Sequence, residues 1–304
     1  MSFYEDLLNL DPGIVLKDEP MSGHTTFRIG GPADFFVVPS DADALMRSLE
    51  LCRKAGLDHM IVGNGSNLLV GDKGYRGVIF DICRTMDSIQ FEEEGDSLVV
   101  NAGAGIMLAS LARQVCQKGY GGFEFATGIP GTLGGGVAMN CGAYGGEIGQ
   151  VLLSVEVLDE ANHLRTIDVG DLHLTYRNSD VLRYGLVVVS AKLAFVKGDE
   201  KAIMERVAEL SAARKDKQPL EYASAGSTFK RPEGYFAGKL IQDCGLKGFH
   251  MGDAWVSEKH AGFVVNKGNA SAADIRALMD HVVKTVEAHF GVVLQPEIRF
   301  VGDF

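Results

Sequence analysis

The sequence predicts a mixed α/β protein of more than one domain. Short apolar segments with the character of strands alternate along the chain with stretches that have helical periodicity. The chain has 304 residues, which is long enough for two or three domains. A basic segment closed by a proline, residues 214–219, suits a boundary between domains.

The expected elements follow one another in a simple order. Helices are predicted at residues 40–55, 106–118, 199–214, 236–244 and 271–290, and an apolar stripe is clearest in the first, second and last of these. Short apolar runs predict strands at residues 34–38, 60–62, 68–70, 78–80, 98–100, 151–158, 163–167, 186–195 and 263–265. The strands at 151–158 and 163–167 should pair as a hairpin.

The remaining local expectations concern caps and turns. Ser40 is the expected N-cap of the first long helix, and Gly56 its C-cap. Residues 1–20 are expected to form a short helix and a turn. Residues 92–96, three glutamates followed by Gly-Asp, are expected to form a solvated turn.

Residues 125–149 are the most unusual stretch of the chain. They are rich in glycine, contain no lysine or arginine, and have Glu147 as their one acid. So many glycines argue against a stable helix or a regular strand, but they let backbone N–H groups approach a ligand. We interpret the stretch as a buried turn that holds an anionic group such as a diphosphate. The alternative is a set of tight turns in a β-rich protein.

Composition limits the classes of function. The 29 basic and 40 acidic residues give a net charge of −11, which disfavours a general binder of nucleic acid or membrane surfaces. Five widely spaced cysteines, with no Cys-x-x-Cys pair, fit reduced thiols in a cytosol. No signal segment or apolar run of membrane-spanning length is apparent. A soluble, cytoplasmic protein is therefore expected.

A second glycine-rich loop, residues 63–67, directly follows a predicted strand. Neither this loop nor residues 128–136 contains the Gly-Lys-Ser or Gly-Lys-Thr of a phosphate-binding P-loop. Ser66, Asn67 and Thr132 nevertheless add side-chain donors to the exposed backbone, so the two loops could hold a diphosphate without lysine. The eight histidines show no metal-ligand spacing, so no metal site is expected.

Seven motifs occur in order along the chain and together resemble one family. They are Gly63-Asn-Gly-Ser-Asn-Leu-Leu-Val70, Gly128-Ile-Pro-Gly-Thr-Leu-Gly-Gly135, Met139-Asn, Gly142-Ala-Tyr-Gly145, Tyr176-Arg-Asn-Ser179, Ala225-Gly-Ser-Thr-Phe-Lys-Arg-Pro232 and Pro296-Glu-Ile-Arg299. Each is weak alone, but the ordered set, covering about residues 24–302, resembles the UDP-N-acetylenolpyruvoylglucosamine reductases. These flavoenzymes act in bacterial peptidoglycan precursor synthesis, and so in cell-wall biogenesis, cell shape and cell division.

The resemblance implies a fold and a domain order. The implied fold is a two-part FAD-binding α/β unit of the PCMH type followed by a C-terminal α/β substrate-binding domain. The first FAD-binding subdomain would comprise residues 1–82, with the C-terminal tail 296–304 returning to it. The second would comprise residues 83–213, and the substrate-binding domain residues 214–295. The protein is expected to be a monomer.

The resemblance also implies a reaction. NADPH would reduce a non-covalently bound FAD. The reduced flavin would then reduce UDP-N-acetyl-3-O-(1-carboxyvinyl)-glucosamine to UDP-N-acetylmuramate. The FAD-binding residues implied are Gly63, Asn64, Gly65, Ser66, Asn67, Gly128, Ile129, Pro130, Gly131, Thr132, Gly134, Gly135, Asn140 and Ala143.

Three residues fall on the catalytic positions of the family. Ser227 matches the proton donor, Arg177 an arginine suited to gripping the substrate carboxylate, and Glu297 a catalytic glutamate. Without the resemblance, Ser227 reads as a turn cap, Arg177 as half of a surface ion pair and Glu297 as a strand-edge acid paired with Arg299.

Further residues are implied at the substrate. They are Lys217, Lys230, Arg231 and Gln242, although Lys217 could be a linker charge and the other two cations a basic surface corner. Cys141, Thr228 and Gly136 depart from the residues common in the family, and the chain resembles its compact subtype. Two alternatives stay open: an FAD-linked oxidase of the same broad fold, and a non-catalytic flavin- or nucleotide-sugar-binding protein.

Overall fold

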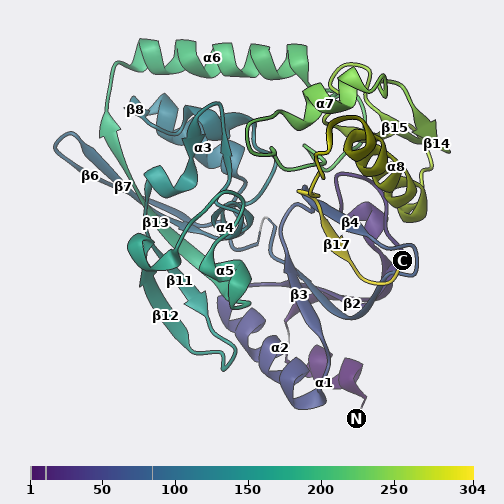
Figure 1. Ribbon diagram of the computed structural model, residues 1–304. Helices are drawn as coiled ribbons and strands as arrows, with labels where there is room; N and C mark the ends of the chain where they lie inside the picture. The colour runs from purple at the N-terminus through teal and green to yellow at the C-terminus, as the bar shows by residue number, and fades with distance from the viewer. Residues whose placement is uncertain (1, 11, 84) are drawn as a thin grey trace. The chain divides into compact units, whose positions relative to one another are not determined.

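Figure 1 shows the computed structural model, which describes residues 2–10, 12–83 and 85–304. The chain divides into two compact units. Unit 1 comprises Met1–Leu16, Phe36–Asn64 and Val78–Ala213, and unit 2 comprises Lys17–Phe35, Gly65–Gly77 and Arg214–Phe304. The three-part domain scheme drawn from the sequence stays a prediction.

Unit 1 is built on one large antiparallel sheet. Its strand order is β12-β11-β13-β7-β6, and the short strand β8 (Tyr120–Gly121) also pairs with β13. The strands are β6 (Ile89–Glu94), β7 (Ser97–Gly103), β11 (Leu152–Leu158), β12 (Leu164–Asp168) and β13 (Val187–Lys197). The predicted hairpin is confirmed, because β11 and β12 pair antiparallel from Ser154↔Asp168 to Leu158↔Leu164.

Helices of unit 1 form where the sequence places apolar stripes. In α2 (Ala42–Ala55), Leu45, Leu49 and Cys52 are buried, and Gly56 ends the helix with φ 64°. In α3 (Leu108–Gln117) the buried residues are Leu108, Leu111, Ala112, Val115 and Cys116. A shorter helix, α4 (Leu133–Ala138), packs against β13 and β7. Both predicted amphipathic helices are therefore confirmed to within a few residues.

The smaller elements of unit 1 are brief and complete its loops. They are α1 (Phe3–Asn9), β3 (His59–Val62), η2 (Glu124–Gly128), β9 (Gly142–Ala143), β10 (Gly146–Glu147), η3 (Ile148–Gln150), η4 (Val169–Leu172) and α5 (Asp180–Arg183). A further sheet has the order β1-β2-β5-β3, in which β1 is Gly13–Pro20, β2 Pro32–Pro39 and β5 Tyr75–Asp81. Within it β3 and β5 run parallel.

Unit 2 combines two small sheets with two helices. Strands β14 (His250–Met251), β15 (Ala254–Val256) and β16 (Val264–Asn266) form an antiparallel sheet. Near the C-terminus, β17 (Arg299–Val301) runs parallel to β4 (Leu68–Val70). The helices are α7 (Ala237–Asp243) and the long α8 (Ala272–Phe290), and a single turn, η1 (Met21–Gly23), completes the unit.

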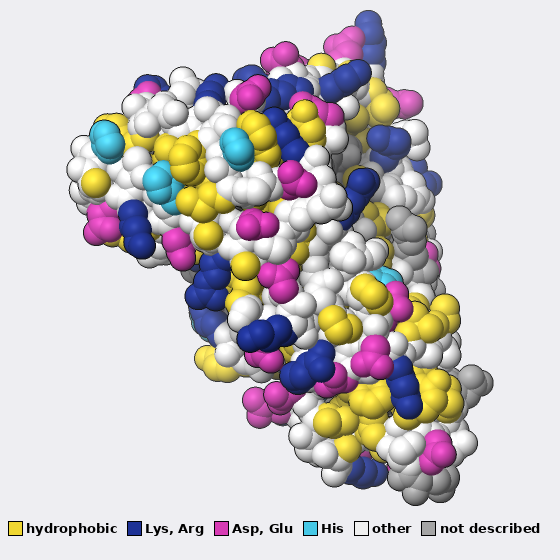
Figure 2. All heavy atoms as spheres, turned by 90° about the vertical axis from the view of Figure 1, so that its right-hand side faces the viewer, with side chains coloured by type: hydrophobic (Ala, Val, Ile, Leu, Met, Phe, Trp, Pro, Cys, Tyr) yellow, Lys and Arg dark blue, Asp and Glu magenta, His cyan; other side chains and the backbone are white. Residues whose placement is uncertain are grey.

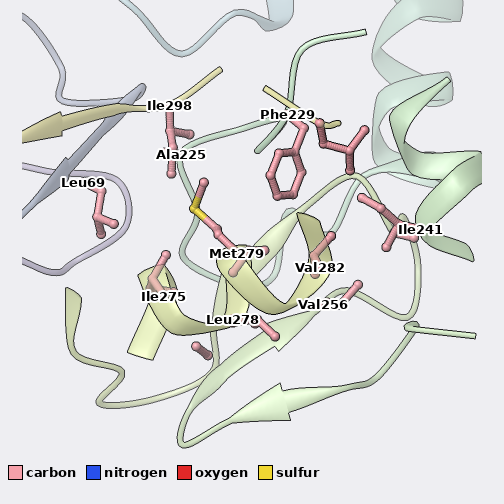
Figure 3. Packing of buried hydrophobic residues seen from close by; sticks show 14 of the residues in the cluster. Leu69, Ala225, Phe229, Ile241, Val256, Ile275, Leu278, Met279, Val282 and Ile298 are labelled. Atoms are coloured by element: carbon pink, nitrogen blue, oxygen red, sulfur yellow. The ribbon is translucent and has the colours of Figure 1, made fainter. Parts of the chain in front are cut away.

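Helix α8 organises the core of unit 2. Ser271 caps it and accepts a hydrogen bond from the Asp274 N–H, and the predicted stripe Ile275, Leu278, Val282 and Val286 is fully buried. Figure 3 shows Ile275, Leu278 and Val282 of this stripe, with the Met279 side chain extending towards Ala225; Phe229 and Ile298 belong to the same buried cluster. These last three residues come from the segments that hold Ser227 and Glu297, so the core anchors both segments.

Two predicted turns are only partly right, because exposed edge strands show no apolar pattern; of residues 92–96, Gly95 and Asp96 form the exposed turn. Residues 13–20 form β1, whose side chains are mostly exposed. The three glutamates of residues 92–94 belong to β6, where Glu92 pairs with Val99 and Glu94 with Ser97. Charged side chains are common on edge strands because they discourage further pairing, and here they resemble a solvated turn in the sequence.

Two other boundaries also differ. The cap of α2 is Asp41, whose carboxylate accepts the Ala44 N–H at 2.7 Å, and not Ser40. Helix α6 (Glu200–Lys217) continues through the segment interpreted as a linker and ends just before Gln218-Pro219. Lys217 is therefore the last residue of a helix, since its charged neighbours extend the helix instead of ending it.

The expectation that residues 125–149 contain no helix is also wrong. Helix α4 has the sequence Leu-Gly-Gly-Gly-Val-Ala and is capped by Thr132, whose side chain accepts the Gly135 N–H. A Cβ atom on Gly134 would lie 2.9 Å from the Ala104 Cβ, and one on Gly136 would lie 2.7 Å from Leu108 Cδ1. These glycines allow close packing, and the dispersion attraction of that packing offsets the low helix propensity of glycine.

The surface of one face is mixed in character. Figure 2 shows Lys and Arg side chains interspersed with Asp and Glu, and histidines lying among hydrophobic side chains. In unit 2 histidine rings stack on aromatic ones, His250 on Trp255 at 4.1 Å and His281 on Phe249 at 4.4 Å between centroids. None of the helices in the described ranges combines the length and apolar character that crossing a membrane requires.

The C-terminal strand should depend on Gly302. Gly302 and Gly291 have similar φ values, 73° and 67°, but only at Gly302 would a Cβ atom collide, 2.0 Å from the Gly74 carbonyl oxygen. Gly291→Ala should cost about 1 kcal/mol, which is the cost of its left-handed backbone. Gly302→Ala should cost about 1–3 kcal/mol more, because the clash adds to the strain. Denaturant unfolding would measure both, and equal losses would contradict the role of the contact.

Candidate active site

The loop at residues 63–66 is distinguished by its backbone N–H donors. Among the residues that the structure describes, no protein acceptor is found for the N–H groups of residues 63–66. The side-chain amide of Asn64 donates to the Pro130 carbonyl at 2.6 Å, and a Cβ atom on Gly63 would lie 2.2 Å from the Thr132 Oγ1. Gly63 and Asn64 therefore pack directly on the second glycine-rich segment, as a pair of ligand-binding loops would require.

The start of α4 uses its backbone donors differently. The Leu133 N–H donates to the Ile106 carbonyl and the Gly134 N–H to the Ala104 carbonyl, both at 2.8 Å. The Gly135 N–H is 3.4 Å from the Thr132 Oγ1. Since protein groups already accept from these three donors, the first turn of α4 is less suited to an anion than the loop at residues 63–66.

Arg177 lies at the tip of a tight turn. Thr175 and Asn178 exchange backbone hydrogen bonds of 3.0 and 3.1 Å, and Arg177 takes the second central position with φ 56°. That conformation favours glycine and costs another residue about 1–2 kcal/mol. The guanidinium donates to the Gly142 carbonyl at 3.2 Å and lies 5.0 Å from the centroid of the Tyr176 ring.

Cys141 and Asn140 lie beside this turn. Burial raises the pKa of the Cys141 thiol to about 12, although the charge of Arg177 opposes the shift, so the group is a neutral thiol at pH 7. Asn140 is buried, and both polar atoms of its side-chain amide contact protein groups. Its predicted role at the flavin stays a prediction, as does that of Ala143.

Sequence reasoning missed a charged cluster next to the Arg177 turn. The Asp180 carboxylate accepts from His173 Nδ1 at 2.8 Å and from the Arg183 guanidinium at 2.7 Å. Hydrogen bonding from His173, together with Arg183, lowers the pKa of Asp180. No spacing in the sequence signals this cluster, because His173 joins it only through the turn of the chain at residues 175–178.

The segments that carry Ser227 and Glu297 are joined in unit 2. The Glu297 N–H donates to the Thr228 carbonyl at 2.8 Å, so the residue after Ser227 pairs with Glu297. Thr228 is buried, its N–H donates to the Gly262 carbonyl at 2.9 Å, and its hydroxyl accepts the Val264 N–H at 2.8 Å. The Ser227 side chain itself is exposed. The serine is therefore presented to solvent from a backbone that is fixed on several sides.

Asn67, from another segment of unit 2, also contacts the backbone of the segment that carries Glu297. Its side-chain amide donates to the Glu297 carbonyl at 3.2 Å, and its own carbonyl accepts the Arg299 N–H at 2.9 Å. The predicted flavin residue Asn67 thus also positions the backbone of a predicted catalytic residue.

The residues expected at the substrate come from different segments of unit 2. The Lys230 N–H donates to the Gln295 carbonyl at 2.8 Å, beside the pairing of Ser227 and Glu297. The Arg231 guanidinium donates to the Tyr235 carbonyl and lies 4.0 Å from the centroid of the Phe236 ring. Gln242 is exposed on α7, and Lys217 ends α6. Lys230 is thus the member of this set that a backbone contact ties to the Ser227 segment.

Comparison with known proteins gives a consistent result. The family model for the C-terminal domain of UDP-N-acetylenolpyruvoylglucosamine reductase matches residues 218–301, and one for an FAD binding domain matches residues 33–168. The reductase of Agathobacter rectalis is 48% identical over 95% of this chain and 95% of its own. That of Lachnoclostridium phytofermentans is 46% identical over 95% of this chain and 93% of its own.

The chain belongs to the UDP-N-acetylenolpyruvoylglucosamine reductase family. A crystal structure of the reductase from Thermus caldophilus covers 95% of this chain and 100% of its own, with a TM-score of 0.81 and 31% identity. The predicted family and the predicted α/β fold class, with an FAD-binding part and a C-terminal domain, are confirmed.

The residues present fit the FAD that this family implies. The N–H groups of residues 63–66 are without a protein acceptor among the described residues, and such groups are suited to phosphate oxygens. Within residues 2–10, 12–83 and 85–304 there is no group of three or more His, Cys, Asp or Glu side chains that could hold a metal ion.

Stability near the Ser227 segment should depend on His260. Burial, together with the charge of Lys247, lowers the pKa of His260 below 6.5, and its Nδ1 accepts the Gly262 N–H at 3.0 Å. The unfolded chain then binds more protons below pH 6.5, so the free energy of unfolding should fall as the pH drops from about 7.5 to about 5.5. Burial also lowers the pKa of His59, so that residue contributes in the same direction.

Replacing this histidine tests the effect. His260→Gln should make the loss of stability between those pH values smaller than in the parent. Denaturant unfolding at each pH would measure how the free energy of unfolding changes with pH. If the free energy of unfolding of His260→Gln changed with pH as much as that of the parent, the contribution of His260 would be contradicted.

Proposed function

We propose that this chain reduces UDP-N-acetyl-3-O-(1-carboxyvinyl)-glucosamine to UDP-N-acetylmuramate, in peptidoglycan precursor synthesis, with NADPH as the reductant. The observation that carries the proposal is the relation, over 95% of the chain, to proteins named UDP-N-acetylenolpyruvoylglucosamine reductase. FAD held by residues 63–67 and 128–135 would supply hydride transfer from NADPH to the alkene of the substrate.

The chemistry requires two things of the side chains. Hydride addition to one alkene carbon leaves negative charge on the other, adjacent to the carboxylate, so the transition state needs stabilising charge or hydrogen bonds. The carbanionic carbon then needs a proton. The product gains one hydride and one proton across the former double bond.

Arg177 is suited to the first requirement. Its guanidinium offers several donors in a fixed plane, which can bind a carboxylate in a bidentate manner. The contact with the Gly142 carbonyl and the tight turn at residues 175–178 limit its motion. This rigidity supports a role in holding the substrate carboxylate and spreading its charge.

Ser227 is suited to the second requirement. Its hydroxyl is exposed, while Thr228 and Phe229 beside it are buried, so the side chain can reach a ligand from an ordered backbone. Glu297, whose N–H donates to the carbonyl of Thr228 next to Ser227, would influence the proton that the Ser227 Oγ gives up. Lys230 follows on the same strand-like segment and is suited to the diphosphate of the substrate.

The remaining assignments are part of the same proposal. Lys217, Arg231 and Gln242 would contact the nucleotide sugar, and residues 63–67 together with residues 128–135 would hold FAD without a covalent bond. The protein would act as a cytoplasmic monomer that binds neither nucleic acid nor membranes. An oxidase of the same broad fold, or a non-catalytic flavin-binding protein, is not favoured.

The first test is simple. The purified protein should be yellow and should release FAD on denaturation, and it should oxidise NADPH at a substantial rate only when the enolpyruvyl substrate is added. A colourless protein without flavin would contradict both flavin-based interpretations. Rapid NADPH oxidation with oxygen alone would instead favour the oxidase.

The role of Ser227 has a test of its own. Ser227→Ala should leave reduction of the flavin by NADPH near the parental rate. Reoxidation by the enolpyruvyl substrate should slow by about 100- to 10,000-fold, because the proton donor is lost. Stopped-flow absorbance separates the two half-reactions. Ser224→Ala, three residues earlier in the same segment, is the matched control and should behave as the parent does; equal slowing of both half-reactions by Ser227→Ala would refute its role as proton donor.

A further inference from the structure

The buried side chain of Asn140 contacts the backbone of the Arg177 turn. Asn140 Nδ2 donates to the Thr175 carbonyl at 3.3 Å, and Asn140 Oδ1 accepts the Gly149 N–H at 3.2 Å. Thr175 is the residue whose backbone closes the turn with Asn178. The amide of Asn140 thus links the base of the turn to the loop that follows α4.

The same loop also contacts the tip of the turn. The Gly142 carbonyl, two residues beyond Asn140, accepts from the Arg177 guanidinium at 3.2 Å. The loop therefore fixes the turn at its backbone through Asn140 and fixes the arginine at its side chain through Gly142. A shift of either contact would move the guanidinium relative to the loop.

The backbone conformation of Asn140 allows its side chain to be removed without disturbing the loop. Asn140 follows the last turn of α4, its N–H donates to the Val137 carbonyl, and its φ is 39°. Asparagine and glycine are the residues that most readily take this left-handed conformation after a helix. Glycine at this position would keep the backbone and remove only the side-chain amide.

We propose that Asn140 is a positioning residue for Arg177, acting through its hydrogen bond to the Thr175 carbonyl. The inference rests on the proposed function, since it concerns the step in which Arg177 holds the substrate carboxylate. It differs from the role predicted from the sequence, in which Asn140 binds FAD. Both polar atoms of the amide are directed at protein groups, which favours positioning over ligand binding.

The first experiment measures the turn itself and needs no activity. Hydrogen exchange should be faster in a peptide that covers residues 174–179 in Asn140→Gly than in the parent. Asn162→Gly is the matched control, because Asn162 also has a positive φ, 60°, and donates its side-chain amide to a backbone carbonyl, that of Met46, at 3.3 Å. Unchanged exchange in Asn140→Gly would overturn the inference, whether or not the parent is active.

The second experiment measures the half-reactions. Asn140→Gly should retain parental FAD content and parental reduction by NADPH, while reoxidation by the enolpyruvyl substrate slows about 10- to 100-fold, the scale expected when a catalytic group is displaced. Asn162→Gly should match the parent in all three. Loss of FAD, or equal slowing of both half-reactions, would make Asn140 a flavin ligand and overturn the inference.

A double-substitution cycle identifies the residue through which Asn140 acts. In an Arg177→Ala background, Asn140→Gly should slow reoxidation by less than about twofold more, because the group that it positions is already gone. Additive losses would overturn the inference. Asn140→Asp, which keeps the size and loses the amide donor, should resemble Asn140→Gly in the parental background. A parent that binds FAD but does not turn over the enolpyruvyl substrate would refute the proposed function, and the exchange experiment would still decide the positioning role.

Discussion

The backbone hydrogen bond from the Glu297 N–H to the Thr228 carbonyl is the constraint on which the candidate site of unit 2 depends. It joins two segments that are far apart in the sequence, and it ties Glu297 to Thr228, the residue that follows Ser227. The bond is protected because Phe229 and Ile298, on either side of it, are both buried in the core organised by α8. Thr228 adds two hydrogen bonds, from its N–H to Gly262 and from Val264 to its hydroxyl. Core packing thus determines the positions of the exposed Ser227 and the half-buried Glu297, and the energy of the core stabilises the arrangement of the site.

The glycines of residues 63–66 and those of residues 128–136 have different structural roles. Gly134 and Gly136 let α4 pack closely against Ala104 and Leu108, and the first N–H groups of the helix donate to neighbouring protein carbonyls. Residues 63–66 instead keep N–H groups for which the described residues supply no acceptor. A glycine-rich sequence alone cannot distinguish these uses, because a close approach to protein and a close approach to a ligand both require a missing side chain. The distinction appears only when the acceptor of each N–H is known.

The same limit explains which parts of the structure could be predicted. Helices α2, α3 and α8 follow from stripes such as Ile275, Leu278 and Val282, since burying one face leaves a period in the sequence. Strands β1 and β6 could not be predicted, because their exposed side chains leave no such period. The catalytic candidates were found through ordered motifs. Their supports were not, because Asn140–Thr175 and Asn67–Glu297 are contacts from a side chain to a backbone carbonyl, and almost any residue can supply a carbonyl.

The conformation of Arg177 shows how the supports and the proposed chemistry are connected. Glycine adopts φ 56° at this turn position with the least strain, so an arginine there costs about 1–2 kcal/mol in backbone energy. Such strain persists only where surrounding contacts determine the conformation. Asn140 and Gly142 supply those contacts from one loop, and the Asp180 cluster lies next to the turn through the contact of Arg183 with Thr175. If a bidentate guanidinium is needed at the tip of the turn, glycine is excluded there, and the rest of the loop must compensate for the strain. In the proposed mechanism the substrate carboxylate would require the arginine, and the strained arginine would in turn require the buried asparagine.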